Sequence, residues 1–280
     1  MLTTHFVSND PISEDRLQTG LQTAFHDVGS GDAFVLVHGF TGSKLDFADQ
    51  LPWFATTHRV LAYDQRGHGE SSNTGPYTLY GLVADLIGFL DAAGIERCHI
   101  LGHSLGGMVV LRALIAHPMR FQSAVLMDTA PYGLSLFDAN VREQLNTLVT
   151  RDGCEALLQG MQGQPQNAAI QRGIDCLGEQ EHWRRIRVKL EQMDPAAFVE
   201  LGSALSDQPS VLSNLSSLSL PTTIIVGEQD EPFIKPSVDM ANAMPHADLV
   251  RIADAGHSPQ YENAEAWQTA LEAHLSRAAV

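Results

Sequence analysis

Short apolar runs rich in β-branched residues alternate with amphipathic segments along most of the chain. Buried strands are predicted at 33–37, 60–63, 99–101, 124–127, 222–226 and 249–252. Apolar residues recur at helical spacing over 79–93, 105–117, 236–244 and 264–276. This alternation is typical of a mostly parallel sheet whose strands are joined by helices on both faces. We therefore expect an α/β fold.

The segment before the first buried strand has a different pattern. Residues 15–19 and 22–27 predict two paired strands. The glycine-rich turn Gly29-Ser30-Gly31 then leads into the apolar run 33–37. We expect the sheet to begin with this pair.

One long segment interrupts the alternation of strands and helices. Between residues 132 and 208 the signals are helical throughout. Capping residues and spacing predict helices from Asp138 to Val149 with Gly153 as the stop, at 179–193, and from Asp194-Pro195 onwards. We expect residues 131–208 to form a helical module inserted into a core domain that comprises 1–130 and 209–280.

Composition and charge exclude several classes of protein. The chain has 280 residues, of which 44% are hydrophobic, enough for a sizeable core and too many for a largely disordered protein. Its 17 basic and 33 acidic residues give a net charge of −16. Such a field repels phosphate backbones and anionic lipid surfaces, so we expect no nucleic-acid partner.

Cysteine and histidine spacing gives no sign of a disulfide framework or a metal site. The three cysteines, Cys98, Cys154 and Cys176, lack CxxC spacing, and the 12 histidines are scattered without paired-ligand spacing. The N-terminal segment lacks the pattern of a signal peptide, and no apolar run approaches the ~20 residues of a membrane span. We expect a cytoplasmic protein that needs no metal or cofactor and does not enter a membrane.

The strongest chemical signal is a GxSxG motif between a strand and a helix. Gly102-His103-Ser104-Leu105-Gly106 follows the predicted strand at 99–101 and opens the predicted helix at 105–117. A serine at so sharp a turn has strained backbone angles and needs neighbours without a Cβ. It also stands at a helix N-terminus, where free N–H groups stabilise developing negative charge. Ser104 is therefore the predicted nucleophile.

A serine nucleophile needs a base and a group that orients the base. Where this elbow occurs, the acid and the histidine follow the serine in the chain, in loops after later strands. Asp230 follows the strand at 222–226, and His257 follows the strand at 249–252. We assign Asp230 as the acid and His257 as the base, with Asp128, after the preceding strand, as the alternative acid.

Two backbone N–H groups are expected to bind the oxyanion. One belongs to Leu105, directly after the nucleophile. The other belongs to Phe40, in the loop after the first buried strand, where Gly39 lets the backbone bend. His38 is interpreted as a residue that shapes this loop, not as a base.

These segments together resemble the α/β-hydrolase fold family over nearly the whole chain. The resemblance rests on 38–40, 102–107, the acid loop at 230, 255–257 and the structural loop 64–71. It implies a mostly parallel central sheet flanked by helices, with the insert at 131–208 as a cap over the nucleophile. It also implies substrate-pocket residues at Phe40, Leu105, Tyr132, Leu134 and Phe233.

The same layout serves several reactions, and fold alone does not choose among them. Our first hypothesis is hydrolysis of small soluble carboxylic esters through an acyl-enzyme. The alternatives are a carbon–carbon bond hydrolase or lactonase with the same triad, a lyase that uses the triad to abstract a proton, and a ligand-binding relative without turnover. Since serine, acid and histidine candidates are all present, the hypothesis of an enzyme is favoured over that of a binding protein.

Overall fold

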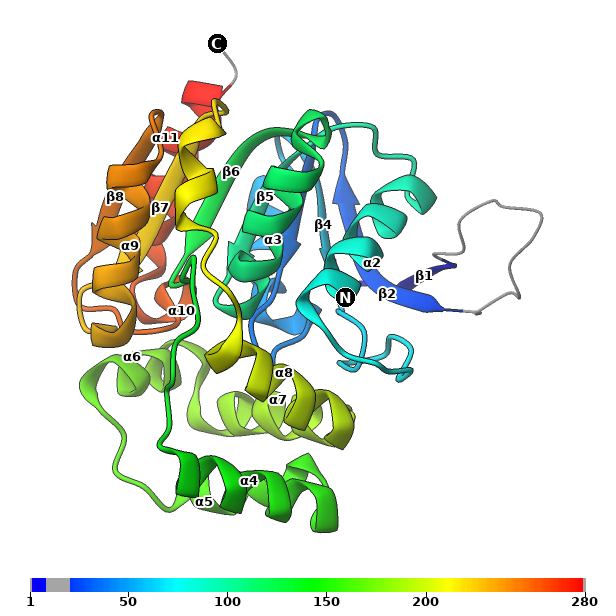
Figure 1. Cartoon of the computed structure of the whole chain (residues 1–280), viewed down its shortest axis with the longest axis vertical. Helices are drawn as coiled ribbons and strands as arrows, with labels where there is room; N and C mark the ends of the chain where they lie inside the picture. The colour runs from blue at the N-terminus through cyan, green and yellow to red at the C-terminus, as the bar shows by residue number, and fades with distance from the viewer. Residues whose placement is uncertain (1, 9–20, 279–280) are drawn as a thin grey trace.

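An eight-stranded sheet forms the centre of the protein (Figure 1). The computed structural model describes residues 2–8 and 21–278. The strands, in the order β1-β2-β4-β3-β5-β6-β7-β8, are β1 His5–Ser8, β2 Gln22–Gly29, β4 Arg59–Tyr63, β3 Ala33–Val37, β5 Cys98–His103, β6 Phe121–Met127, β7 Thr222–Gly227 and β8 Ala247–Ile252. Strands β3 to β8 run parallel, whereas β1 and β2 are antiparallel to their neighbours. The expected α/β fold with a mostly parallel sheet is confirmed.

Alternation along each strand divides the core into two layers. In β3, Val35 and Val37 face one cluster of buried side chains, and Phe34 and Leu36 face the other. Helices α2 (Leu79–Ala92), α3 (Leu105–Ala116) and α9 (Glu231–Ala243) cover the first face. The second face is covered by α1 (Leu51–Phe54) and α11 (Ala264–Ala278). Both faces of β3 are covered, which explains its unbroken apolar run.

The N-terminal edge of the sheet differs from its prediction. The strand expected at 15–19 lies outside the described residues. The outer antiparallel partner of β2 is β1, with His5 opposite Phe25 and Ser8 opposite Gln22, and its inner partner is β4. Because β1 is a short, largely exposed edge strand, it lacks the apolar run that marks the central strands.

Helix α9 also begins earlier than predicted. Its first residue is Glu231, whereas the spacing of apolar residues predicted a start at Pro236. Pro232 stands in the first turn, where a backbone N–H is not needed. Pro236 lies inside the helix and removes one donor there, a loss that the surrounding packing tolerates.

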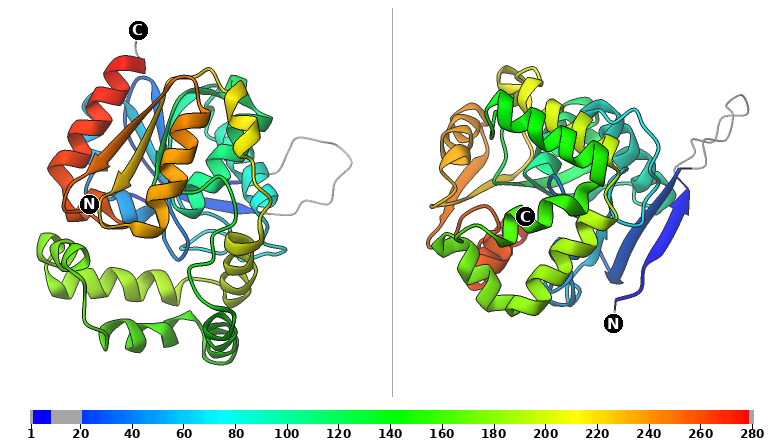
Figure 2. Two further views of the ribbon diagram at one scale, coloured as in Figure 1. Left: turned by 60° about the vertical axis from the view of Figure 1, so that its left-hand side comes forward. Right: turned by 90° about the horizontal axis from the view of Figure 1, so that it is seen from below.

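Five α-helices lie between β6 and β7 and form a layer of their own beyond one end of the sheet (Figures 1 and 2). They are α4 Ala139–Asp152, α5 Leu157–Gln162, α6 Ala168–Leu177, α7 Glu179–Glu191 and α8 Pro195–Asp207. Asp138 caps α4 by accepting the N–H groups of Asn140 and Val141, and Asp194 caps α8 by accepting that of Ala196. Local capping chemistry therefore sets where these two helices begin.

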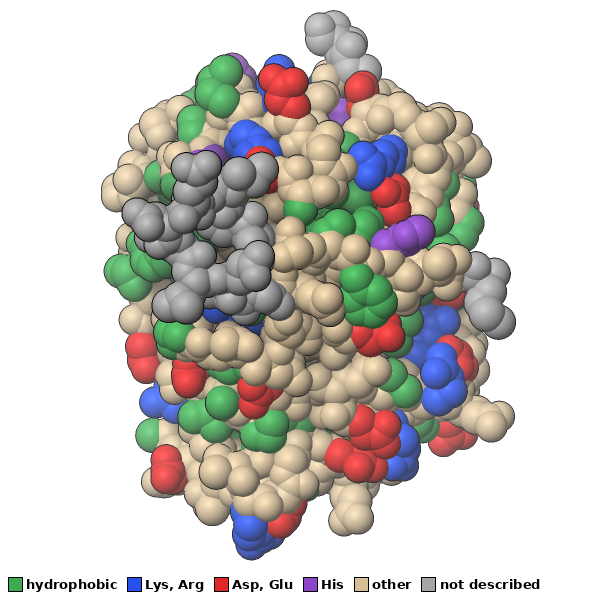
Figure 3. All heavy atoms as spheres, turned by 90° about the vertical axis from the view of Figure 1, so that its right-hand side faces the viewer, with side chains coloured by type: hydrophobic (Ala, Val, Ile, Leu, Met, Phe, Trp, Pro, Cys, Tyr) green, Lys and Arg blue, Asp and Glu red, His purple; other side chains and the backbone are tan. Residues whose placement is uncertain are grey.

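The surface carries charges of both signs. On the face in Figure 3, basic side chains lie beside acidic ones and do not gather into one patch. Within residues 2–8 and 21–278, no helix combines the length and apolarity that crossing a membrane requires.

Candidate active site

Ser104 sits on a strained turn between β5 and α3. Its φ of 53° and ψ of −119° lie in a region that residues with a Cβ rarely occupy. Two hydrogen bonds hold the turn: Ser104 N–H donates to Met127 O (2.9 Å), and Thr129 Oγ1 donates to Ser104 O (2.6 Å). The elbow is thereby tied to the neighbouring strand β6 and to the loop after it.

The glycines on either side of Ser104 are needed for close backbone contact. A Cβ on Gly102 would lie 2.7 Å from the carbonyl oxygen of Gly106. A Cβ on Gly106 would lie 2.4 Å from the carbonyl oxygen of His38. Backbone atoms cannot yield as a flexible side chain does, so the GxSxG spacing is a packing requirement of this turn.

Asp230 and His257 meet at the same edge of the sheet. Asp230 follows β7 and His257 follows β8. His257 Nδ1–H donates to Asp230 Oδ2 at 2.7 Å, and the Asp230 side chain is 8% exposed against 41% for the imidazole. The ring of Phe233 lies against that imidazole, with centroids 4.8 Å apart. With the proton on Nδ1, Nε2 is the nitrogen that can accept a proton.

Two residues that the sequence analysis did not single out hold the His257 loop. His103 Nε2–H donates to the carbonyl oxygen of His257 at 2.7 Å. Burial lowers the pKa of His103 to about 3, so this ring is neutral near pH 7. Glu262 accepts the N–H groups of Gly256 (2.6 Å) and Ser258 (3.1 Å). His103 directly precedes Ser104 in the GxSxG motif, so its position in the sequence could have identified it as a residue near the site.

The loop after β3 lies against Ser104. A Cβ on Gly39 would stand 3.0 Å from Ser104 Cβ. His38 Nε2 accepts the N–H of Gln65 (3.0 Å), and its Nδ1–H donates to Gly39 O (2.8 Å). Burial lowers the pKa of His38 to about 4, so it holds the loop as a neutral ring. This arrangement brings the backbone of Gly39 and Phe40 to the Ser104 side of the sheet.

Ser104, Asp230 and His257 open onto one cavity of about 600 Å³. Its floor comes from the loops after β3, β5, β7 and β8, and its opposite wall from α6 and α7. The lining from the helical layer includes Ala169, Ile170, Gly173, Leu177, His182, Trp183, Arg185, Ile186, Lys189 and Leu190. A helical layer over a polar floor encloses a space of small-molecule size.

Only some of the predicted pocket residues line this cavity. Phe40 lines the cavity, and Leu134 lines a smaller neighbouring groove that Phe40 also borders. Leu105, Tyr132 and Phe233 are not among the residues that line this cavity. Leu105 is fully buried beneath the elbow, and Phe233 packs behind His257. Tyr132 Oη instead donates to Asp239 at 2.7 Å.

The backbone N–H of Leu105 lies at the start of α3, directly after Ser104. Leu105 is the first residue of α3, where helix geometry leaves the N–H group without an acceptor inside the helix. This N–H and the positive end of the helix dipole lie next to Ser104.

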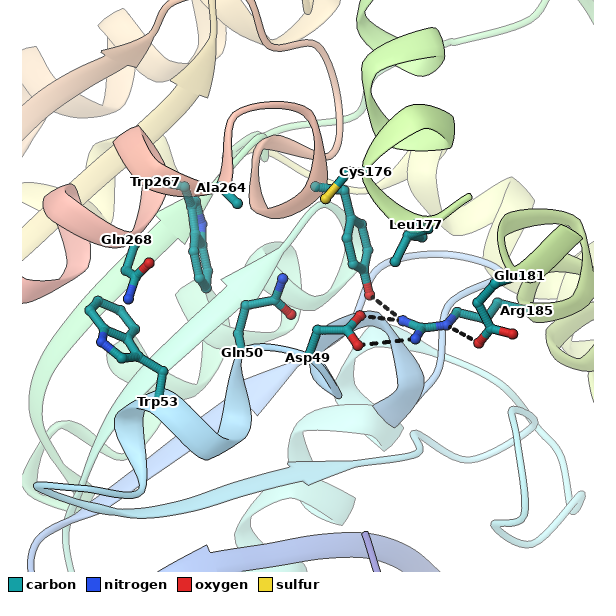
Figure 4. A pocket seen from close by; sticks show the side chains of 11 residues that line it. Asp49, Gln50, Trp53, Cys176, Leu177, Glu181, Arg185, Ala264, Trp267 and Gln268 are labelled. Atoms are coloured by element: carbon teal, nitrogen blue, oxygen red, sulfur yellow. Dashed lines mark hydrogen bonds and ion pairs between the residues drawn. The ribbon is translucent and has the colours of Figure 1, made fainter. Parts of the chain in front are cut away.

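Charged side chains of α7 connect the helical layer to the sheet domain. Lys189 Nζ donates to Asp46 at 2.6 Å, and Arg185 pairs with both Asp49 and Glu181. Figure 4 shows Arg185 at one end of a second cavity of about 440 Å³. Because Leu177, Arg185 and Tyr261 line both cavities, these three residues form the wall between them.

Comparison with known proteins agrees with this fold. A family model described as alpha/beta hydrolase fold matches residues 32–264. The chain belongs to this family. This α/β hydrolase is 30% identical over 273 residues to the putative carbamate hydrolase RutD of Pseudomonas syringae pv. syringae (strain B728a), covering 90% of this chain and 97% of that protein.

Two further similarities cover almost the whole α/β hydrolase. The 2-hydroxymuconate semialdehyde hydrolase of Pseudomonas putida is 28% identical over 275 residues, 95% of each chain. The crystal structure of a hydrolase from Pseudomonas aeruginosa PA01 superposes with a TM-score of 0.80 at 25% identity, covering 97% of this chain and 98% of that one. These relatives are all named as hydrolases, one of a carbamate and one of a semialdehyde, so the similarities support a hydrolase without identifying its substrate.

Proposed function

We propose that this α/β hydrolase cleaves small carboxylic esters through an acyl-enzyme, with Ser104 as nucleophile, His257 as base and Asp230 as the acid that orients it. The observation that carries the proposal is the 2.7 Å hydrogen bond from His257 Nδ1 to Asp230, formed where Ser104 opens onto the same cavity. That bond leaves Nε2 as the acceptor for the serine proton.

In the first step Ser104 Oγ attacks the ester carbonyl while His257 Nε2 takes the serine proton. The oxyanion accepts hydrogen bonds from the N–H groups of Phe40 and Leu105. His257 then gives the proton to the leaving alcohol, and the C–O bond breaks to leave an acyl group on Ser104. Water attacks this acyl-enzyme by the same sequence and releases the acid.

We infer that residues 131–208 act as a cap that limits substrate size. Helices α6 and α7 supply one wall of the cavity, and ion pairs from Lys189 and Arg185 hold α7 on the sheet domain. A bounded space favours short acyl groups, because a chain longer than the cavity must displace packed helices. We expect acetate and butyrate esters to react faster than esters of long fatty acids.

A carbon–carbon bond hydrolase is the second candidate. It is supported by the 28% identity to 2-hydroxymuconate semialdehyde hydrolase over 95% of both chains. The same serine, base and oxyanion donors suit attack on a ketone carbonyl, which is followed by departure of a carbon leaving group in place of an alcohol. The substrate preference, not the triad, separates the two candidates.

The test compares kcat/KM for p-nitrophenyl esters from C2 to C16, an aryl carbamate, a simple lactone and a vinylogous diketone. A preference for short esters supports the proposal. Preference for the diketone by orders of magnitude would replace it with the second candidate, and an optimum at long chains would contradict the bounded cavity.

The Ser104→Ala variant is the matched control, because it removes the nucleophile without adding bulk to the elbow. It should reduce turnover at least about 10³-fold, with residual rate from the oxyanion donors. A fluorophosphonate should label wild-type Ser104, as located by peptide mapping. Undiminished activity in this variant, or a label on another residue, would refute the assignment of the nucleophile.

A further inference from the structure

Asp128 is a buried carboxyl group that the mechanism above leaves without a task. It stands directly after β6 with a φ of 44°, and it is 0% exposed. Its backbone N–H donates to Ile225 O (2.9 Å), and its Oδ1 accepts the N–H of Gly227 (2.9 Å). Its other oxygen, Oδ2, is buried and receives no hydrogen bond from a donor in residues 2–8 or 21–278. An unsatisfied carboxylate oxygen at this depth is costly, so its surroundings need an explanation.

The neighbour of Asp128 is the catalytic acid itself. One ligating atom from each of Asp128, Asp230 and His257 falls within a cluster whose members all lie within 4.8 Å of one another. Two buried carboxylates this close cannot both carry a charge, because the repulsion and the desolvation add. A single proton between the two carboxyl groups removes the repulsion and also gives Asp128 Oδ2 a hydrogen-bonding partner.

The environment decides which carboxyl holds the proton. Asp230 accepts the hydrogen bond from His257 Nδ1, whereas Asp128 has no such donor on Oδ2. Burial raises the pKa of Asp128 well above its usual range, and the charges of Asp230 and Glu262 act in the same direction. The charged or titratable groups around the pair are Glu262, His257 and His103, and His103 is neutral near pH 7.

We propose that Asp128 is a neutral carboxylic acid whose O–H donates to the Asp230 carboxylate, and that it positions Asp230 for His257. The bond gives the Asp230 carboxylate a second donor besides His257 Nδ1 and restricts its rotation. The pair keeps a single negative charge next to the imidazole. Its effect on turnover rests on the proposed function, whereas the protonation state of Asp128 does not.

Two substitutions of Asp128 test separately its neutral charge and its hydrogen bond to Asp230. Asp128→Asn keeps a donor toward Asp230 and an acceptor for Gly227, and asparagine tolerates positive φ. Asp128→Gly removes the side chain without backbone strain at a φ of 44°. Asp230→Asn, which removes the charge beside His257, is the positive control for loss of activity.

We expect Asp128→Asn to hydrolyse the best ester within about threefold of wild type, with the acid limb of its pH–rate profile unmoved. Asp128→Gly should lower kcat about tenfold or more at nearly unchanged KM, the effect of losing one hydrogen bond to a charged group. If Asp128 were ionised, the Asn variant would lose a charge, and its acid limb would move down by about one pH unit or more. That movement, or a wild-type rate in the Gly variant, would overturn the proposal.

Infrared difference spectroscopy tests the proton without any substrate. Wild type minus Asp128→Asn at pH 8 should contain the C=O band of a protonated carboxyl group, whereas a carboxylate band in its place would refute the neutral state. A divalent cation shared by the two acids would also satisfy Oδ2. Dialysis against EDTA should therefore leave activity unchanged, and a loss that Zn²⁺ or Mg²⁺ restores would contradict the proton. If Asp230→Asn keeps full activity, the proposed function fails, but the infrared result still stands.

Discussion

The ring of Phe40 separates the catalytic cavity from an apolar groove. It lines the cavity of about 600 Å³ and also a groove of about 50 Å³ that is bordered by Leu134, Phe137 and Phe198. The Phe40 and Phe198 rings pack with centroids 5.1 Å apart. Replacing Phe40 by alanine removes six ring carbons and joins the two spaces. The backbone N–H proposed to bind the oxyanion is retained.

The expected result is a shift of acyl-chain preference toward longer esters. The vacated ring leaves room for at least two additional methylene groups, and each contributes about 0.8 kcal/mol when buried. Two of them amount to about 1.6 kcal/mol, or roughly a 15-fold gain in kcat/KM for the longer ester relative to the shorter. Acetate hydrolysis should stay within about threefold of wild type, because an acetyl group has no further methylene groups to place in the added space.

The assay measures kcat/KM for p-nitrophenyl esters from C2 to C12 with wild type, Phe40→Ala and Phe137→Ala. Phe137 is 55% exposed and borders the groove but not the cavity, so its substitution should leave the chain-length profile unchanged. An unchanged profile in Phe40→Ala, or an equal loss at every chain length, would show that the ring does not divide the two spaces.

Two further predictions concern the pH dependence of folding stability and the ion pairs that attach α7 to the sheet domain. His274 bonds to Ser123 Oγ and Thr223 Oγ1, and burial lowers its pKa to about 4. In the unfolded chain His274 binds a proton below about pH 6.5, whereas in the folded protein it does so only near pH 4. The contribution of His274 to the free energy of unfolding is therefore greatest above pH 6.5, and it should fall by about 1.4 kcal/mol per pH unit between pH 6.5 and pH 4. The free energy of unfolding, measured by urea titration between pH 7 and 5, should depend less steeply on pH in His274→Gln than in wild type. The same slope in both proteins would contradict this role of His274. Arg185→Met should raise KM more than it lowers kcat and should lower Tm by about 2–4 °C, since the lost pairs are partly exposed. Arg151→Met, which breaks a pair on the outer surface of α4, is the control, and equal effects of the two substitutions would refute a specific role of Arg185.

Local chemistry was enough to predict much of this protein from its sequence. The elbow at Ser104 was predicted because glycines at 102 and 106 meet a backbone requirement that is set within a few residues. Asp138 and Asp194 were expected as helix N-caps, and their side chains accept the N–H groups two or three residues later. Each of these features depends on short-range sterics or hydrogen bonds, which a sequence displays directly.

Features that depend on long-range packing were missed or misplaced. The outer partner of β2 is β1, an exposed edge strand whose pairing is set across the sheet and not by its own pattern. Tyr132 and Phe233 were placed in the pocket, yet one bonds to Asp239 and the other packs behind His257.

The walls and the charges of the site were likewise decided by tertiary structure. Apolar spacing predicted that α7 is a helix, but not that Arg185 and Lys189 would turn toward the sheet domain and line the cavity. Asp128 was noted as an alternative acid, whereas its contact with Asp230 arises because β6 and β7 are neighbours in the sheet. Periodicity tells which side of an element is apolar, and only the folded chain decides which element covers that side and which charges it brings together.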